Sequence, residues 1–195
     1  MKLFYTQNSP YARRARLAAR ASGLGIEEVD IGSMRAGGGA TMQQYGPGAK
    51  VPGLLTDSGV FLCETLIITG YICEKSSVPL MSFDEVLLEI EGTGQVLTDA
   101  LFARNEERQR PEEQASQSRI ALETERIIGC YDLLHDRLSG QQPDMNLAQF
   151  SAVAALGYAD WRGADDNCRE GRSGLAAWFD AMQDNTDVAA TAPVF

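Results

Sequence analysis

Ser9 and Pro10 stand where a polar loop gives way to a segment rich in alanine and arginine, and both residues are typical of a helix start. Serine is a preferred N-cap, and proline at the first helical position lacks only an N–H that would have no partner anyway. A helix that begins here brings a hydroxyl donor and several unpaired backbone N–H groups to one point. Because such groups favour negative charge, we predict anion chemistry at this point.

Two other short motifs have residue types suited to binding. Pro52 in Val51-Pro52 cannot donate a ladder hydrogen bond, so it belongs at the start or edge of a strand, with the side that lacks an N–H turned to a ligand or loop. Glu64 and Thr65 open a predicted helix, where a hydroxyl and a backbone N–H can bind a carboxylate. Each motif also has a purely structural explanation. Ser9 alone could be a simple helix cap, and Glu64-Thr65 alone could be an ordinary helix start.

The charge of the chain narrows the classes of ligand. The 195 residues carry 17 lysines and arginines against 27 aspartates and glutamates, a net charge of −10. An acidic chain repels phosphate backbones, so we expect no general binding of nucleic acid. Residues 1–76 carry eight basic side chains against six acids, whereas residues 77–195 carry nine against twenty-one. The first part is therefore better suited to an anionic ligand.

The cysteines and the single histidine offer few ligands for a metal site. None of the four cysteines belongs to a C-x-x-C pair, and His135 is the only histidine. We therefore expect no metal, four reduced thiols, and no catalytic role for His135, with Cys63 buried. Trp161 and Trp178 stand at helical positions and are expected in the core.

The hydropathy pattern predicts a cytoplasmic protein with no membrane helix. The longest apolar runs, at residues 152–156 and 175–179, have five residues and are far shorter than a bilayer span. The N-terminal residues turn polar before the apolar region of a signal peptide could form.

The first part of the chain is predicted to alternate strands and helices. A strand, a crossover helix and a second strand indicate a parallel βαβ unit, and a turn at residues 56–59 indicates a hairpin. Three consecutive glycines in residues 37–48 favour a flexible connection there. The predicted strands cover residues 2–6, 26–31, 51–55 and 60–62, and the predicted helices cover residues 9–23 and 64–75.

Beyond a linker near residue 78, no strand signal appears. Apolar residues recur at helical spacing up to about residue 109, and Pro111 with the acids after it is typical of a helix restart. Asn146 begins another helix, which runs through Trp161, and a further helix covers residues 173–182. The second part is therefore predicted to be all-helical.

Three motifs in a fixed order resemble the cytosolic glutathione S-transferase family, in a bacterial type with serine at the catalytic position. The sequence S-P-Y-A-R-R-A-R at residues 9–16 is similar to the family's opening [S/C]-P-x-x-x-[R/K]-x-R. K-V-P-G-L at residues 50–54 resembles its K-V-P-x-L segment, which contains a cis-proline. Residues 62–71 resemble its L-x-E-S-x-x-I-x-x-Y element, and residues 147–162 its capped core helix.

The resemblance implies a fold and an activity. The fold is α/β plus all-α, with a thioredoxin-like domain (β-α-β-α-β-β-α) over residues 1–76 and an all-helical domain over residues 82–195. The activity is that of a glutathione transferase, which activates the thiol for attack on a small hydrophobic electrophile in detoxification. No metal or organic cofactor is implied, since glutathione is a co-substrate. The alternative is a protein of this fold that binds glutathione, or regulates, without turnover.

The resemblance also implies roles for single residues. Ser9 takes the catalytic position, and its hydroxyl and the helix terminus favour the thiolate. Asn8 and Tyr5 lie within reach of the same point and are alternative donors. Because Cys is replaced by Ser9 and a second thiol by Ala12, a dithiol reaction is not expected.

The glutathione backbone is expected to contact the other two motifs. Val51 would pair with the cysteinyl moiety beside a cis Val51–Pro52 bond. Thr65 would bind the γ-glutamyl carboxylate, and Glu64 would accept from the ammonium. The usual N-P before K-V-P is Gly46-Pro47 here, so the contact to the glycyl carboxylate stays open between three side chains, those of Lys50, Gln43 and Gln44.

The resemblance implies a homodimer and places the electrophile between the two domains. The electrophile is expected near Gln7, Asn8 and Tyr11 on one side and Leu97 to Arg104 on the other, with Tyr11 and Phe102 affecting substrate preference. Asp99 of one subunit is expected to reach the γ-glutamyl ammonium in the other. The alternative for Asp99 is one acid among many on a solvated helix face.

Overall fold

The computed structural model describes residues 1–194, and its first part is built around a four-stranded mixed sheet. The strand order is β2-β1-β3-β4, with β1 parallel to β2 and antiparallel to β3, and β3 antiparallel to β4. The predicted βαβ unit and hairpin are thus confirmed. The strands are β1 (Lys2–Tyr5), β2 (Glu27–Asp30), β3 (Gly53–Leu55) and β4 (Phe61–Cys63).

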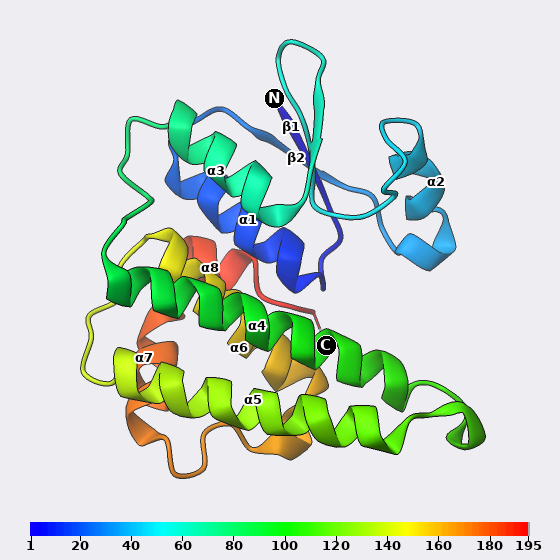
Figure 1. Ribbon diagram of the computed structural model, residues 1–195. Coiled ribbons are helices and arrows are strands. Elements are labelled where there is room, and N and C mark those ends of the chain that lie inside the picture. Colours follow the sequence, from blue (N-terminus) through cyan, green and yellow to red (C-terminus); the bar gives the residue numbers. More distant parts are fainter. Residues whose placement is uncertain (195) are drawn as a thin grey trace.

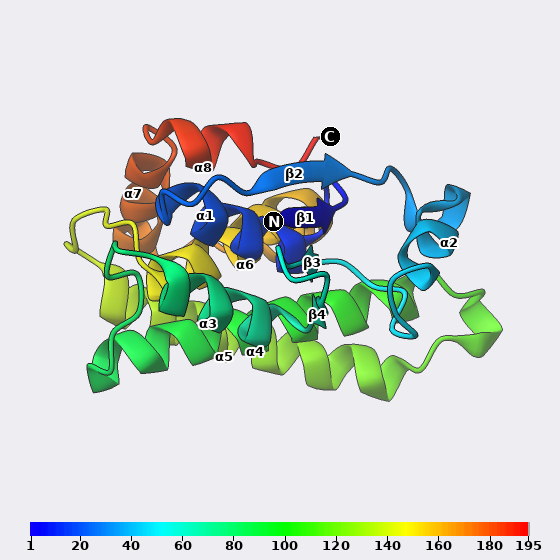
Figure 2. The ribbon, with the colours of Figure 1, turned by 90° about the horizontal axis from the view of Figure 1, so that it is seen from above.

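Helices α1 (Pro10–Ala21) and α3 (Thr65–Lys75) pack together and lie between the sheet and the second part of the chain (Figure 1). The connection of residues 37–48 contains a short helix, α2 (Gly38–Gln43), as the family order implies and unlike the flexible connection that its glycines favour. Gly38 approaches the backbone so closely that a Cβ there would lie 3.0 Å from the carbonyl oxygen of Ser33. Figure 2 shows α2 at the edge of the domain, away from α1 and α3.

Five helices form the second part in the described chain, and α6 is their centre. Its residues 147–159 are all buried, and it packs on α1, α4 and α7. The all-helical prediction is confirmed. The helices are α4 (Glu85–Arg108), α5 (Gln117–Leu138), α6 (Leu147–Arg162), α7 (Ser173–Met182) and α8 (Thr186–Ala190).

Two details of the helical part differ from expectation. Pro111 leads only into a 3-10 turn, and α5 begins six residues later, because the Ser116 hydroxyl caps it by accepting from the Arg119 N–H at 3.3 Å. Helix α8 was not predicted, and its cap is Asn185, whose side-chain oxygen accepts from the N–H groups of Asp187 and Val188.

Helices α4 and α6 approach each other most closely at Gly94. A Cβ on Gly94 would lie 2.6 Å from the Ser151 Oγ and 2.7 Å from the Ser151 carbonyl carbon. The Ser151 hydroxyl in turn donates to the Glu91 carbonyl oxygen at 2.8 Å. A side chain larger than hydrogen at position 94 would therefore force the two helices apart.

Two buried arginines of α1 join the sheet domain to the helices. The Arg13 guanidinium donates to the carbonyl oxygens of Val153 on α6, at 3.2 Å, and Val188 on α8, at 3.1 Å. Burial lowers the pKa of Arg13 to about 10. Arg14 forms an ion pair with Glu91 on α4. Because buried charges need partners, these contacts fix α1 against α4, α6 and α8.

Within residues 1–194, no helix combines the length and the apolar character that crossing a membrane requires.

Candidate functional site

The strand register brings the three sequence motifs to one end of the sheet. Phe4 on β1 faces Gly53 on β3, and Gly53 faces Cys63 on β4. The residues that follow β1, precede β3 and follow β4 therefore lie side by side. These residues are the loop that ends at Ser9, the dipeptide Val51-Pro52, and Glu64 with Thr65.

Ser9 caps α1 as predicted. It has extended backbone geometry, and its Oγ accepts from the Ala12 N–H at 3.2 Å. The cap uses only a lone pair of the hydroxyl, and within the described chain the hydroxyl hydrogen has no acceptor. Ser9 thus keeps one donor free at a helix N-terminus, where negative charge is favoured.

Asn8 holds the C-terminal segment of the chain. Its Nδ2 donates to the Val194 carbonyl oxygen at 3.0 Å, and its Oδ1 accepts from the Val194 N–H at 2.8 Å. Both functional groups of the Asn8 amide are therefore engaged with the backbone.

Tyr11 bridges the two parts of the chain. Its hydroxyl donates to the Asp99 Oδ1 on α4 at 2.6 Å, and the Gln95 Nε2 donates to the same oxygen at 3.1 Å. Burial and the bond to Asp99 raise the pKa of Tyr11 above its ordinary value. The single O–H of Tyr11 is therefore committed to Asp99.

Tyr5 is held from α1 as well. The Arg16 guanidinium lies 3.9 Å from the centroid of the Tyr5 ring and is itself bound to Glu28 on β2 at 2.6 Å. The ring of Tyr5 is thus fixed by a salt-bridged cation.

The Val51–Pro52 peptide bond is cis, and Pro52 is buried at the start of β3. Gly53 follows because no side chain fits there: a Cβ would lie 2.3 Å from the Phe61 ring. The backbone of Val51 is thereby held at the end of the sheet.

Glu64 and Thr65 open α3. Glu64 is the N-cap and has φ 71°, a left-handed conformation that a side chain disfavours by about 1–3 kcal/mol. Such strain is concentrated at functional positions. Glu64 is exposed, whereas Thr65 beside it is buried.

All three side chains that were candidates for the glycyl carboxylate are accessible to a ligand. Lys50, Gln43 and Gln44 are all exposed. Tyr45 fastens their loop to the sheet, since its ring lies 4.7 Å from that of Phe4, centroid to centroid.

Cys63 corrects an expectation, because it is exposed rather than buried. It follows Leu62, which packs against the core, so the Cys63 side chain points to the opposite face of β4. Trp178 is in the core, as predicted, and Trp161 is half-buried. His135 accepts the Leu175 N–H at 3.3 Å, which links α5 to α7.

An aromatic row that sequence reasoning missed as a unit extends from α1 to the end of α6. Its successive ring centroids are 5.9, 6.5 and 5.8 Å apart. The sequence positions gave no signal beyond the individual aromatic residues, because the row depends on how α1, α4 and α6 pack. Its members are Tyr11, Phe102, Tyr158 and Trp161.

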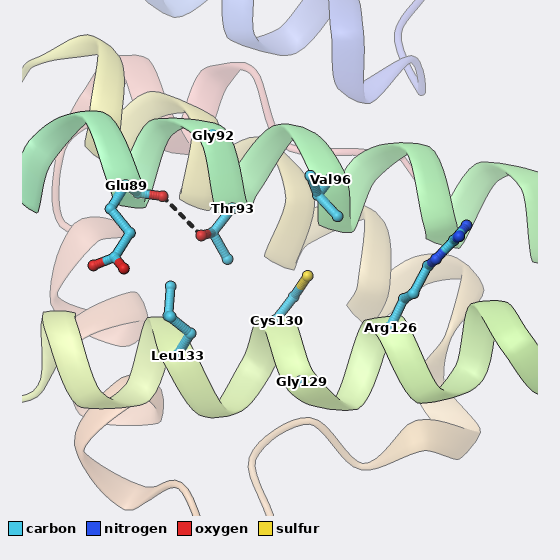
Figure 3. Close-up of a pocket in the computed structure, with 8 residues that line it drawn as sticks. All are labelled: Glu89, Gly92, Thr93, Val96, Arg126, Gly129, Cys130 and Leu133. Atoms are coloured by element: carbon cyan, nitrogen blue, oxygen red, sulfur yellow. Dashed lines mark hydrogen bonds between the residues drawn. The ribbon is translucent and has the colours of Figure 1, made fainter.

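A groove of about 480 Å³ lies elsewhere, between α4 and α5 (Figure 3). Gly92 and Gly129 leave it open, Val96 and Leu133 line it with apolar side chains, and Glu89 and Arg126 stand at its ends. In the described part of the chain, His, Cys, Asp and Glu side chains form no group of three that could hold a metal ion.

Comparison with known proteins bears on both parts of the chain. Residues 3–79 match the model of the glutathione S-transferase N-terminal domain. The GST-like protein YibF of Escherichia coli K12 is 27% identical over 170 residues, which are 83% of each chain.

Solved structures with the same fold cover nearly the whole chain. A glutathione S-transferase from Methylobacterium radiotolerans, in complex with glutathione sulfonate, is 25% identical with a TM-score of 0.88, covering 100% of this chain and 95% of its own. One from Methylobacillus flagellatus, with GSH bound, is 22% identical with a TM-score of 0.87 and 99% coverage of both chains. The fold is thus a thioredoxin-like N-terminal domain followed by a helical region, and residues 3–79 match the glutathione S-transferase N-terminal domain.

Proposed function

We propose that the protein is a glutathione transferase in which Ser9 stabilises the glutathione thiolate. The observation that carries the proposal is the free O–H of Ser9 at the N-terminus of α1, next to Val51 and Thr65 at one end of the sheet. Solved structures of this fold contain bound glutathione, which supports a glutathione site in this chain.

The hydrogen bonds of the neighbouring residues favour Ser9 as the donor. Asn8 uses both of its polar groups on Val194, and Tyr11 gives its only hydroxyl hydrogen to Asp99. Tyr5 is the remaining alternative, and its ring is held by Arg16. A hydrogen bond to the thiolate and the helix terminus can together lower the thiol pKa by about two units, which corresponds to roughly 2.7 kcal/mol.

The other contacts place the glutathione backbone. The Val51 main chain pairs with the cysteinyl moiety, and the Thr65 hydroxyl and N–H bind the γ-glutamyl carboxylate. Glu64 accepts from the γ-glutamyl ammonium, and the strained backbone of Glu64 fits a position kept for binding. Lys50 is the cationic candidate for the glycyl carboxylate.

In the reaction, the thiol proton leaves to solvent and the sulfur attacks the electrophilic carbon. A carbon–sulfur bond forms, and either the leaving group departs with its electron pair or the electrophile takes up a proton. Ser9 acts on the developing thiolate rather than on glutathione binding as a whole, so it contributes to kcat more than to affinity.

The proposal includes a homodimer, for which exposed apolar side chains supply the surface. Leu66 and Ile67 on α3 are 55% and 59% exposed. We place these side chains of one copy in the α4–α5 groove of the other, where Val96 is 49% exposed. The weakly basic first part and the acidic second part complement each other across such a pairing.

Sedimentation equilibrium at micromolar protein tests the assembly. The wild type is expected to be a dimer, and the double variant Leu66→Asp/Ile67→Asp a monomer. Val60→Asp is the matched control, because Val60 is exposed to a similar degree on the hairpin and lies outside the proposed contact. A monomeric wild type contradicts the dimer.

Calorimetric titration with glutathione and an assay with a panel of electrophiles and hydroperoxides test the activity. Ser9→Ala should lower kcat about a hundredfold, the equivalent of roughly 2.7 kcal/mol, with little change in the glutathione Kd. Ser9→Thr keeps a hydroxyl and a cap and should retain activity. If Ser9→Ala is unchanged and Tyr5→Phe is inactive, the donor is Tyr5.

Binding without any reaction across the panel would favour the alternative, a glutathione-binding or regulatory protein without turnover. Absence of glutathione binding would contradict both.

A further inference from the structure

The aromatic row is most exposed at Phe102, and the part of the row formed by Tyr11 and Phe102 is called its open end below. Phe102 is 38% exposed, whereas Tyr158 behind it is 3% exposed. Tyr11 places the open end two residues from Ser9, so an electrophile held against the Phe102 ring lies beside the point where the thiolate is proposed to form.

Asp99 puts a negative charge at this open end. It precedes Phe102 by three residues on α4, so the two side chains share a helix face. Only its Oδ1 is used, by Tyr11 and Gln95. Within residues 1–194, its Oδ2 accepts no hydrogen bond, and the side chain is exposed.

A second acid strengthens the negative charge. Glu106 follows Phe102 by one helical turn and is exposed. Its charge contributes to the raised pKa of both Tyr11 and Tyr158, after burial, which is the largest cause in each. It therefore adds negative charge near the row.

The cations near the row do not offset these acids at its open end. Arg104 is buried and occupied by Asp166, with one contact at 2.8 Å. Arg162 lies 3.8 Å from the Trp161 ring centroid, at the opposite end of the row. The open end is therefore apolar in its centre and negative at its rim.

From this arrangement we infer that Asp99 makes the enzyme discriminate against anionic electrophiles. The Phe102 ring offers a stacking face, and the carboxylate of Asp99 repels a negative substituent on a ring placed there. The inference rests on the proposed function and adds a specificity residue.

Two electrophiles of nearly the same shape test the inference, 4-chloro-3,5-dinitrobenzamide and the anionic 4-chloro-3,5-dinitrobenzoate. In each, the glutathione sulfur bonds to the carbon that carries chlorine, the carbon–chlorine bond breaks, chloride leaves with its electron pair, and the thiol proton goes to solvent. Each kcat/KM is measured at saturating glutathione and divided by the uncatalysed rate constant of the same compound.

The wild type should prefer the amide at least tenfold after this normalisation, and Asp99→Asn should reduce the preference to threefold or less. The ratio of two electrophiles cancels any effect of Asp99 on glutathione itself. Asp136→Asn is the control for net charge, because Asp136 is an exposed acid near the C-terminus of α5. This variant should leave the preference for the amide unchanged.

Other results overturn the inference. Equal rates for the two compounds, a preference for the benzoate, or an Asp99→Asn ratio equal to that of the wild type each contradict it. If calorimetry shows that glutathione binds but neither compound reacts, the inference about the electrophile is wrong and the glutathione site is supported. If glutathione does not bind, the proposed function itself fails.

Discussion

The sheet domain and the helical region contribute to the site in different ways. In the sheet domain, each candidate residue belongs to a short local motif: a helix cap at Ser9, a cis X-Pro bond at Val51–Pro52, and a helix start at Glu64. In the helical region, no such motif exists, and Asp99 and Phe102 meet Tyr11 only because α4 packs against α1. From this difference we predict that the proposed thiol activation and the proposed electrophile choice can be disturbed separately.

Gly94→Ala gives the largest effect that we expect in the helical region. A Cβ there would lie within 3 Å of the backbone of Ser151 and Ala152, so α4 and α6 must separate. We expect a loss of about 1–3 kcal/mol in the free energy of unfolding, typical of overpacking. Urea denaturation at one protein concentration measures the loss.

Gly25→Ala is the control, since a Cβ there meets nothing within 4 Å and Gly25 lies outside the proposed dimer contact. Its φ is not positive, so the change should be neutral or stabilising by about 0.4–1 kcal/mol, the usual gain when alanine replaces glycine at a compatible position. If both variants unfold at the same urea concentration, the close approach at Gly94 does not matter for stability.

Phe102→Ala should lower kcat/KM for a neutral aromatic electrophile about tenfold, through the loss of ring stacking and apolar contact area. The glutathione Kd should not change, because Phe102 belongs to the helical region. Steady-state kinetics and calorimetry on the same preparation measure both quantities. If Phe102→Ala and Tyr11→Ala both leave substrate preference untouched, the electrophile binds elsewhere.

Asn8→Ala should release the segment that ends at Val194, because it removes the two hydrogen bonds that hold this residue. The free energy that holds this segment in place should fall by about 1–2 kcal/mol, and hydrogen exchange at the Val194 amide should accelerate. Gln7→Ala, at an exposed neighbouring position, is the control. A large loss of kcat with no change in exchange would instead assign Asn8 to the chemistry.

Glu28 gives the smallest predicted effect, a loss of fold stability at acidic pH. Burial opposes its ionisation, but hydrogen bonds from Arg20 and Arg16 prevail and hold the pKa of Glu28 below its usual 4.5. A lowered folded-state pKa stabilises the fold above pH 4.5, and this contribution is lost as the pH falls through the folded-state value.

Glu28→Gln should therefore flatten the fall in Tm below pH 4.5, relative to the wild type. Glu27→Gln is the control, because Glu27 is exposed and its ion pair with Lys2 lies in solvent. Equal slopes of Tm against pH for the wild type and Glu28→Gln would mean that the ion pairs with Arg16 and Arg20 do not contribute to stability.

What the sequence could predict follows from the same comparison between regions. Ser9-Pro10 and Asn146 signal their helices locally, so α1 and α6 begin where expected. Helix α2 was not visible from its residues, because Gly38 and Gly39 have low helix propensity and close backbone contacts override it. The exposure of Cys63 could not be predicted either, since it depends on which face of β4 packs against the core.

The contacts between the two regions were the least predictable. Asp99 stands 88 residues from Tyr11, and no local pattern indicates that the two share a hydrogen bond. The same holds for Asn8 and Val194, which are 186 residues apart. Such pairs arise from the packing of α1 against α4 and of the last segment against the β1–α1 loop.

The pKa of the thiol of glutathione bound to the protein tests the central claim most directly. It is obtained by following thiolate absorbance in the ultraviolet against pH, for glutathione bound to the wild type, to Ser9→Ala and to Ser9→Thr. The account predicts a pKa about two units below the ordinary value of about 8.5 for the wild type and Ser9→Thr, and a return towards that ordinary value for Ser9→Ala. The same pKa in the wild type and Ser9→Ala would contradict it.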